Sequence, residues 1–194
     1  MPLMDHFHPP LHPRRHWESF HVTWAGAIAD ALNETLLPDG YFAEEHTLFP
    51  FQYEVRVHAS GARLVAALEL VSPANKDRDS HRRAFANKCA GYLAQGIAVI
   101  VVDVVTSRGG NLHADILRLL GRTADTGLPD GTALYAVAYR PVVRDREGQV
   151  EVWPAALAVG SELPTLPLAL NADLCLPIDL EATYTAACNR RRLG

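Results

Sequence analysis

The chain is poor in cysteine, in long apolar runs and in net charge. Its 194 residues include three cysteines, Cys89, Cys175 and Cys188, and no CxxC pair, which disfavours a disulfide framework or a thiolate zinc site. No apolar run approaches the roughly 20 residues that a membrane-spanning helix needs. The first residues hold prolines and histidines where a secretory signal would be apolar. We therefore expect a cytoplasmic protein with no membrane partner.

Neither sign of charge dominates. Eighteen Lys and Arg residues stand against 22 Asp and Glu residues, a formal net charge of -4, which argues against a broad basic surface for nucleic acid but not against a local basic patch. The length fits one domain over residues 1–194. Within it we predict an extended arm at 1–15, a core at 16–105 and a C-terminal elaboration at 106–194. A homo-oligomer is left open.

Hydrophobic periodicity predicts an α/β fold. The first part of the chain reads as a helix, three strands, a helix and a strand, at 17–37, 41–49, 51–59, 64–71, 80–95 and 97–105. Strands 64–71 and 97–105 are apolar on both faces, so we expect them side by side in the sheet. Additional C-terminal strands at 133–143 and 149–159 precede a closing helix at 179–192, and the proline-rich stretch 163–177 is expected to be extended coil.

Glu69 interrupts a strand that is otherwise apolar on both faces. Burial of an ionised carboxylate costs roughly several kcal/mol of hydration free energy. A nearby cation must offset that cost. That cation could be an arginine, a lysine or a divalent metal, and carboxylate oxygens suit magnesium or manganese.

Two further carboxylates accompany it. Glu54 lies on the polar face of its strand beside Arg56, where a solvated face is the ordinary explanation, but a neighbouring strand could bring it to the same ion as Glu69. Asp103 ends the buried strand 97–105, where it could cap the next loop or pair with a cation.

Candidate cations follow the Glu69 strand. On the helix, Lys88 shares a stripe with His81, Phe85 and Tyr92 because these residues are three or four apart. We predict that the Lys88 ammonium points toward Glu69. The turn before the helix holds Ser72, Asn75 and Lys76, with Arg78, Arg82 and Arg83 following.

These motifs resemble those of the PD-(D/E)XK restriction-endonuclease-like superfamily. ELVSPANK, followed by K-x3-Y, GI and an apolar strand ending in VD, is similar to the pattern of the Uma-type endonucleases. PLMDHF, WESFH, ELVSPANK and LPTLPLAL also resemble, over nearly the whole chain, an uncharacterised bacterial domain-of-unknown-function family with an E-V-L-S-P-x-N-K motif. The superfamily lysine follows the strand carboxylate by two residues, a position that Val71 holds here, so Lys88 or Lys76 would replace it.

The resemblance implies a restriction-endonuclease-like core and a metal-dependent phosphodiesterase acting on DNA or RNA. Glu54, Glu69 and the Leu70 carbonyl would hold Mg²⁺ or Mn²⁺, and Lys88 would orient the attacking water or offset charge. Phosphate contacts would come from the turn and the helix start, from Ser72, Asn75, Lys76, Arg78, Arg82 and Arg83.

Two alternatives are open. The same fold could be a catalytically degenerate binding or assembly module in which a salt bridge engages Glu69. Alternatively, imidazoles near the N-terminus could hold zinc, although their spacing fits no fixed motif; these are His6, His8, His12, His16 and His21. We expect the arm up to Pro13 to lack regular secondary structure, because of its prolines, and to pack through Phe7 and Leu11.

Overall fold

A six-stranded mixed sheet, with helices on both faces, organises the protein. The computed structural model describes residues 1–48, 52–121 and 127–193. The elements in chain order are α1 (Trp17–Ala31), the π-helical turn η1 (Leu32–Leu36), β1 (Tyr41–Leu48), β2 (Gln52–Ala59), β3 (Arg63–Leu70), α2 (Pro73–Lys76), α3 (Asp79–Ala94), β4 (Ala98–Asp103), α4 (Leu112–Leu119), β5 (Tyr135–Arg144), β6 (Glu147–Ala156), β7 (Thr165–Ala169), β8 (Cys175–Asp179) and α5 (Leu180–Arg191).

The strands follow one another in space in the order β1-β2-β3-β4-β5-β6. Only β3 and β4 are parallel; every other neighbouring pair is antiparallel. The parallel pair is joined through α2 and α3, because parallel neighbours need a crossover connection. The predicted helix–strand order and the adjacency of 64–71 and 97–105 are confirmed. The separation predicted at Pro50 lies outside the described residues.

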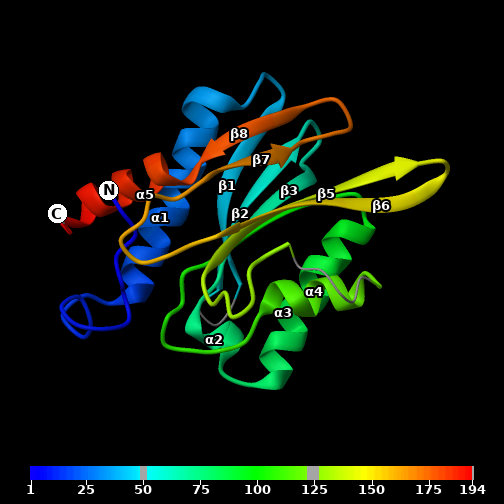
Figure 1. Ribbon diagram of the computed structural model, residues 1–194. Coiled ribbons are helices and arrows are strands. Elements are labelled where there is room, and N and C mark those ends of the chain that lie inside the picture. The colour runs from blue at the N-terminus through cyan, green and yellow to red at the C-terminus, as the bar shows by residue number, and fades with distance from the viewer. Residues whose placement is uncertain (49–51, 122–126, 194) are drawn as a thin grey trace.

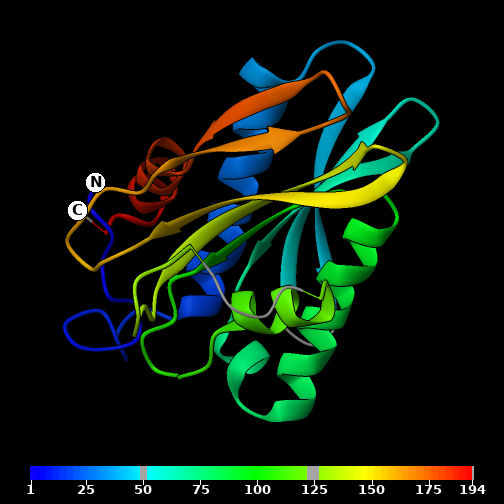
Figure 2. The same ribbon diagram turned by 45° about the vertical axis from the view of Figure 1, so that its right-hand side comes forward.

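Two hydrophobic layers enclose the sheet (Figure 1). Helices α1 and α5, with the β7–β8 hairpin, cover one face, where Trp24, Leu68 and Tyr184 belong to one buried cluster. Helices α3 and α4 cover the other face, where Phe85, Val101 and Ile116 belong to a second cluster. Figure 2 shows these layers from a second side. Since β4 contributes Ile100 to the first cluster and Val99 to the second, its all-apolar sequence follows from being covered on both faces.

The sequence analysis predicted extended coil for the proline-rich stretch 163–177, and this prediction is wrong. The stretch includes strand β7, which pairs with β8. Pro167 stands opposite Pro177 in the ladder. A residue without an N–H can occupy a non-hydrogen-bonded position of an antiparallel pair, where its nitrogen would point away from the partner strand in any case. Two prolines that share one such position leave the neighbouring hydrogen bonds intact.

The N-terminal arm has no helix or strand, as predicted, and packs on the α1/α5 face. Phe7 contacts both hydrophobic clusters. Leu3 is its most deeply buried apolar residue, whereas Leu11 is half-buried. Among the described residues, no helix is both long and apolar enough to span a membrane.

Candidate functional site

Glu54 and Glu69 stand directly opposite each other on β2 and β3. Directly opposed residues of an antiparallel pair point to the same face, and here that is the face on which α3 lies. Both are almost fully buried, with 0% and 2% exposure. The two carboxylates predicted to be anomalous therefore meet at one point beneath α3.

Lys88 reaches this point from α3. Its ammonium Nζ lies 3.2 Å from Glu54 Oε2 and 2.7 Å from Glu69 Oε1. It also lies 5.5 Å from the centre of the Phe85 ring, one turn earlier on the same stripe. The prediction that Lys88 points toward Glu69 is confirmed by these distances. The point between the two carboxylates thus already holds a cation.

Arg56 and Tyr92 complete the cluster, and the sequence analysis gave neither a role in it. Arg56 Nε lies 2.5 Å from Glu54 Oε1. The Tyr92 hydroxyl donates to Glu54 Oε1 at 3.2 Å and accepts a hydrogen bond of 3.2 Å from Arg56 Nη2. The signal was present: Arg56 follows Glu54 by two residues on one strand face, and Tyr92 follows Lys88 by one helical turn.

The two acids are electrostatically unequal. Burial would raise the pKa of Glu54, but a hydrogen bond with Glu69 and the Lys88 and Arg56 cations lower it to about 2. Burial raises the pKa of Glu69 to about 8, with the Glu54 carboxylate adding to the rise and Lys88 opposing it. The pKa of Lys88 is raised by Glu69 and Glu54 although burial opposes this. Near neutral pH we therefore expect Glu69 to hold a proton and Glu54 to be ionised.

The Leu70 carbonyl, expected as a metal ligand, is engaged elsewhere. It accepts a hydrogen bond of 2.9 Å from His21 Nε2 on α1. Because His21 approaches from the α1 face and the Glu69 side chain points to the α3 face, this carbonyl and the two carboxylates do not converge. The protein ligands available to a metal ion at this point are the carboxylates of Glu54 and Glu69.

Two carboxylates are nevertheless a sufficient protein contribution for magnesium, which usually keeps several waters and binds substrate phosphates as well. The Lys88 ammonium occupies the position where both carboxylates converge. In the part of the chain that the structure describes, no group of three or more His, Cys, Asp or Glu side chains could hold a metal.

The turn that follows β3, which the sequence analysis predicted to contact phosphates, is held together by buried hydrogen bonds. Asn75 Oδ1 accepts hydrogen bonds from the Ser72 amide at 2.8 Å and from the Ser72 hydroxyl at 3.0 Å, and both residues are buried. Lys76 is also buried, with its Nζ 2.9 Å from Asp103 Oδ2. Asp103 is thus a structural ion-pair partner, and Lys76 does not replace the motif lysine next to Glu69.

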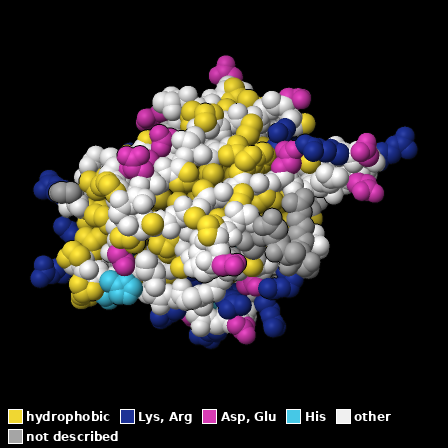
Figure 3. All heavy atoms as spheres, in the orientation of Figure 1, with side chains coloured by type: hydrophobic (Ala, Val, Ile, Leu, Met, Phe, Trp, Pro, Cys, Tyr) yellow, Lys and Arg dark blue, Asp and Glu magenta, His cyan; other side chains and the backbone are white. Residues whose placement is uncertain are grey.

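The three arginines predicted to contact phosphates differ in exposure. Arg78 is 68% exposed and Arg83 is exposed, whereas Arg82 is half-buried with its Nε 3.4 Å from Asp115 Oδ2. Lys and Arg side chains gather along the lower edge of the face in Figure 3, where Figure 1 places α2 and the start of α3. Arg78, although its Nε lies 3.6 Å from Asp77 Oδ2, and Arg83 are therefore exposed to an anionic partner.

The N-terminal histidines do not form a zinc site. His6 is buried, stacks on Phe20 with ring centroids 4.2 Å apart, and hydrogen-bonds the Tyr184 hydroxyl at 2.8 Å. His8 contacts Asp5, while His12 and His16 are exposed. Burial lowers the pKa of His6 and of His21 to about 4. The His6 and His21 imidazoles are therefore neutral packing groups near neutral pH.

Comparisons with protein-family models, with curated proteins and with solved structures find no match to this chain.

Proposed function

We propose that the protein is a divalent-metal-dependent phosphodiesterase that cuts DNA or RNA, built on a restriction-endonuclease-like core. One observation carries the proposal: Glu54, Glu69 and Lys88 come from two strands and a helix and meet within 3.2 Å of one ammonium nitrogen. A buried charge cluster is costly, and replacement of such a cluster by apolar residues is often neutral or stabilising. A functional role accounts for its presence better than stability does.

The residues have distinct roles in this reaction. Glu54 and Glu69 would hold Mg²⁺ or Mn²⁺, which when bound polarises the phosphodiester and activates a water. Displaced from between the carboxylates, Lys88 would keep contact with Glu69 and donate to the attacking water or to a phosphate oxygen. Arg56 and Tyr92 fix the Glu54 carboxylate by hydrogen bonds. Arg78 and Arg83 would contact the nucleic-acid backbone through charge alone.

A nuclease assay tests the proposal. Labelled single- and double-stranded DNA and RNA are incubated with the full chain in Mg²⁺, Mn²⁺ or EDTA. We expect metal-dependent cleavage that falls about 100-fold or more in Glu54→Gln, Glu69→Gln and Lys88→Met, as is typical when a group that stabilises the transition state is removed. The matched control is Glu162→Gln, which changes an exposed carboxylate in the loop before β7. All variants are purified in parallel, so that cleavage by a contaminating nuclease would appear equally in each. Equal cleavage by all variants would refute the assignment.

A second function is favoured by the charge balance of the same cluster. Arg56 and Lys88 pair with Glu54 and Glu69 without a metal, and His21 engages the Leu70 carbonyl. These contacts suit a catalytically degenerate module of the same core that binds or assembles through its surface. Absence of cleavage together with unchanged binding of labelled nucleic acid in Glu69→Gln would favour this module over the phosphodiesterase. A nucleic-acid substrate is consistent with the proposed cytoplasmic location.

A further inference from the structure

A cavity of about 690 Å³ opens where the sheet loses a strand. The β4–β5 ladder ends at the pair Val99 and Tyr139, yet β5 continues as far as Arg144, paired there with β6 alone among the strands that the structure describes. On the other side, β3 pairs with β4 only from Ala66 onward. The space that a longer β4 would fill is therefore left between β3 and the outer half of β5.

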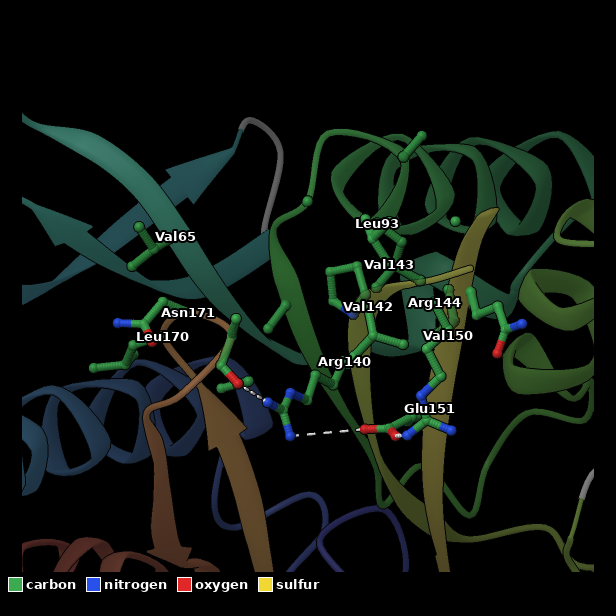
Figure 4. Close-up of a pocket in the computed structure, with 18 of the residues that line it drawn as sticks. Val65, Leu93, Arg140, Val142, Val143, Arg144, Val150, Glu151, Leu170 and Asn171 are labelled. Atoms are coloured by element: carbon green, nitrogen blue, oxygen red, sulfur yellow. Dashed lines mark hydrogen bonds and ion pairs between the residues drawn. The ribbon is translucent and has the colours of Figure 1, made fainter. Parts of the chain in front are cut away.

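The cavity wall is mostly apolar. The end of α3 and the turn between β7 and β8 close the space on its two sides, and Figure 4 shows apolar side chains from several elements facing it. The main apolar contributors are Val65, Leu93, Val142, Val150 and Leu170. Ligand cavities in proteins are typically about 300–1,000 Å³, largely apolar, with a few convergent polar groups. This cavity meets the size and the apolar condition.

Its charged groups are gathered on β5 and β6 and carry a net positive charge. Arg140 and Glu151 face each other as a cross-strand pair, with Arg140 Nη1 3.7 Å from Glu151 Oε2. Arg140 also donates to the Ala172 carbonyl, and Arg144 binds Glu151 (Figure 4). Two guanidinium groups therefore share one carboxylate. The buried Arg140 Nε has no hydrogen-bond partner among the described residues.

We propose that this cavity is a binding site for a small amphipathic molecule with an apolar chain and one carboxylate. A carboxylate is the complement of a guanidinium fork, which can donate two parallel hydrogen bonds to it. One ligand charge also completes the balance of Arg140 and Arg144 against Glu151. The apolar chain displaces water from the wall formed by β3, α3 and β5, which is favourable in proportion to the area covered.

Isothermal titration calorimetry on the full chain tests the proposal with three probes of one length: sodium octanoate, octan-1-ol and octylammonium chloride. We expect saturable binding of octanoate, at least about tenfold tighter than that of the other two, because a charge-assisted hydrogen bond is worth about that factor. Absence of saturation with octanoate, or equal affinity for octylammonium, overturns the proposal.

Two variants locate the site. Arg140→Gln should remove the preference for octanoate over octanol, whereas Arg146→Gln, at the tip of the β5–β6 hairpin and outside the cavity, should keep it. Val142→Trp should fill the space and abolish binding of both, whereas Val159→Trp, at an exposed position elsewhere, should not. Octanoate binding that is unchanged in Arg140→Gln or in Val142→Trp would contradict the assignment. If Arg140→Gln fails to fold, the Val142→Trp pair alone decides.

Discussion

Lys88 Nζ lies 2.7 Å from Glu69 Oε1, joining the middle of α3 to the end of β3. The same nitrogen lies 3.2 Å from Glu54 Oε2. Because one flexible cation serves two buried acids, the stability of the core and any metal affinity depend on the same three side chains.

Metal binding should compete with this lysine. Millimolar Mg²⁺ or Mn²⁺ at about ten times its dissociation constant should stabilise the protein by about 1.4 kcal/mol, a rise in melting temperature of about 3–5 °C. Glu69→Gln should lose the rise. Lys88→Met should show a larger one, because the competing ammonium is gone. Thermal unfolding with and without metal measures the change in melting temperature of the three proteins. If the wild-type melting temperature does not shift at about 10-fold higher metal concentration, a metal site with the assumed dissociation constant is excluded.

Removal of the lysine should be costly without metal. Lys88→Met leaves Glu69 without its cation and Glu54 with Arg56 as its remaining cation, so the free energy of unfolding should fall by about 3 kcal/mol. Arg83→Met, on the exposed side of the same helix, should change it by less than about 0.5 kcal/mol. Urea denaturation gives both values. A loss that is equal in the two variants would mean that the ammonium contributes little to compensating Glu54 and Glu69.

The raised pKa of Glu69 predicts a pH dependence. The pKa of Glu69 is about 8 in the folded protein, against an ordinary value of 4.5 in an unfolded chain. The folded protein therefore holds a proton that the unfolded chain releases, so this contribution to stability is present below pH 4.5 and lost as pH rises through 8. Glu54, with its pKa lowered to about 2, acts in the opposite sense and loses its contribution as pH falls from 4.5.

The comparison of wild type with Glu69→Gln isolates this group. Between pH 6.5 and 8 the wild type should lose stability relative to the variant by up to about 1.4 kcal/mol per pH unit. Denaturant unfolding at several pH values measures the difference, in which the contributions of His6 and His21 cancel. Parallel curves for the two proteins would show that Glu69 does not titrate in this window.

The buried pair of Lys76 and Asp103 should show strong coupling. Asp103→Asn leaves the Lys76 ammonium uncompensated and should cost about 3–5 kcal/mol of unfolding free energy. The double variant Lys76→Met with Asp103→Asn should recover more than half of this, because Asn keeps the acceptor for the Val105 amide while no charge remains buried. A double-mutant cycle in urea measures the coupling. Additive losses would contradict it.

The sequence predicted the part of the site that depends on burial. Glu69 was identifiable because it interrupts a strand that is apolar on both faces, and Lys88 because its helical stripe faces the sheet. Lys76 could not be assigned, since a lysine on a short turn reads as solvated until the position of Asp103 is known. The partner of the Leu70 carbonyl was also unpredictable, because His21 is 49 residues away and only the packing of α1 brings it there.

The C-terminal region shows the limit of composition. Prolines at 167 and 177 predicted coil, and the structure pairs them in a hairpin. Proline removes a donor, but whether that donor was needed depends on register, which a single sequence does not reveal. The closing helix predicted at 179–192 is confirmed by α5, and Asp179 caps its start by accepting a hydrogen bond of 2.9 Å from the Ala182 amide.

Two prolines in the β5–β6 hairpin disfavour edge-to-edge pairing with another molecule. Pro141 stands opposite Val150 and Pro154 opposite Val137. Both prolines therefore occupy non-hydrogen-bonded positions of the β5–β6 pair, where the nitrogen points away from the partner strand. The Pro141 nitrogen points to the side where β4 has ended, and the Pro154 nitrogen points to the outer side of β6. A strand from another molecule that approached either side would find a donor missing at the centre of the ladder. The hairpin can therefore project from the sheet, with Val143 78% exposed, without becoming a template for fibrils.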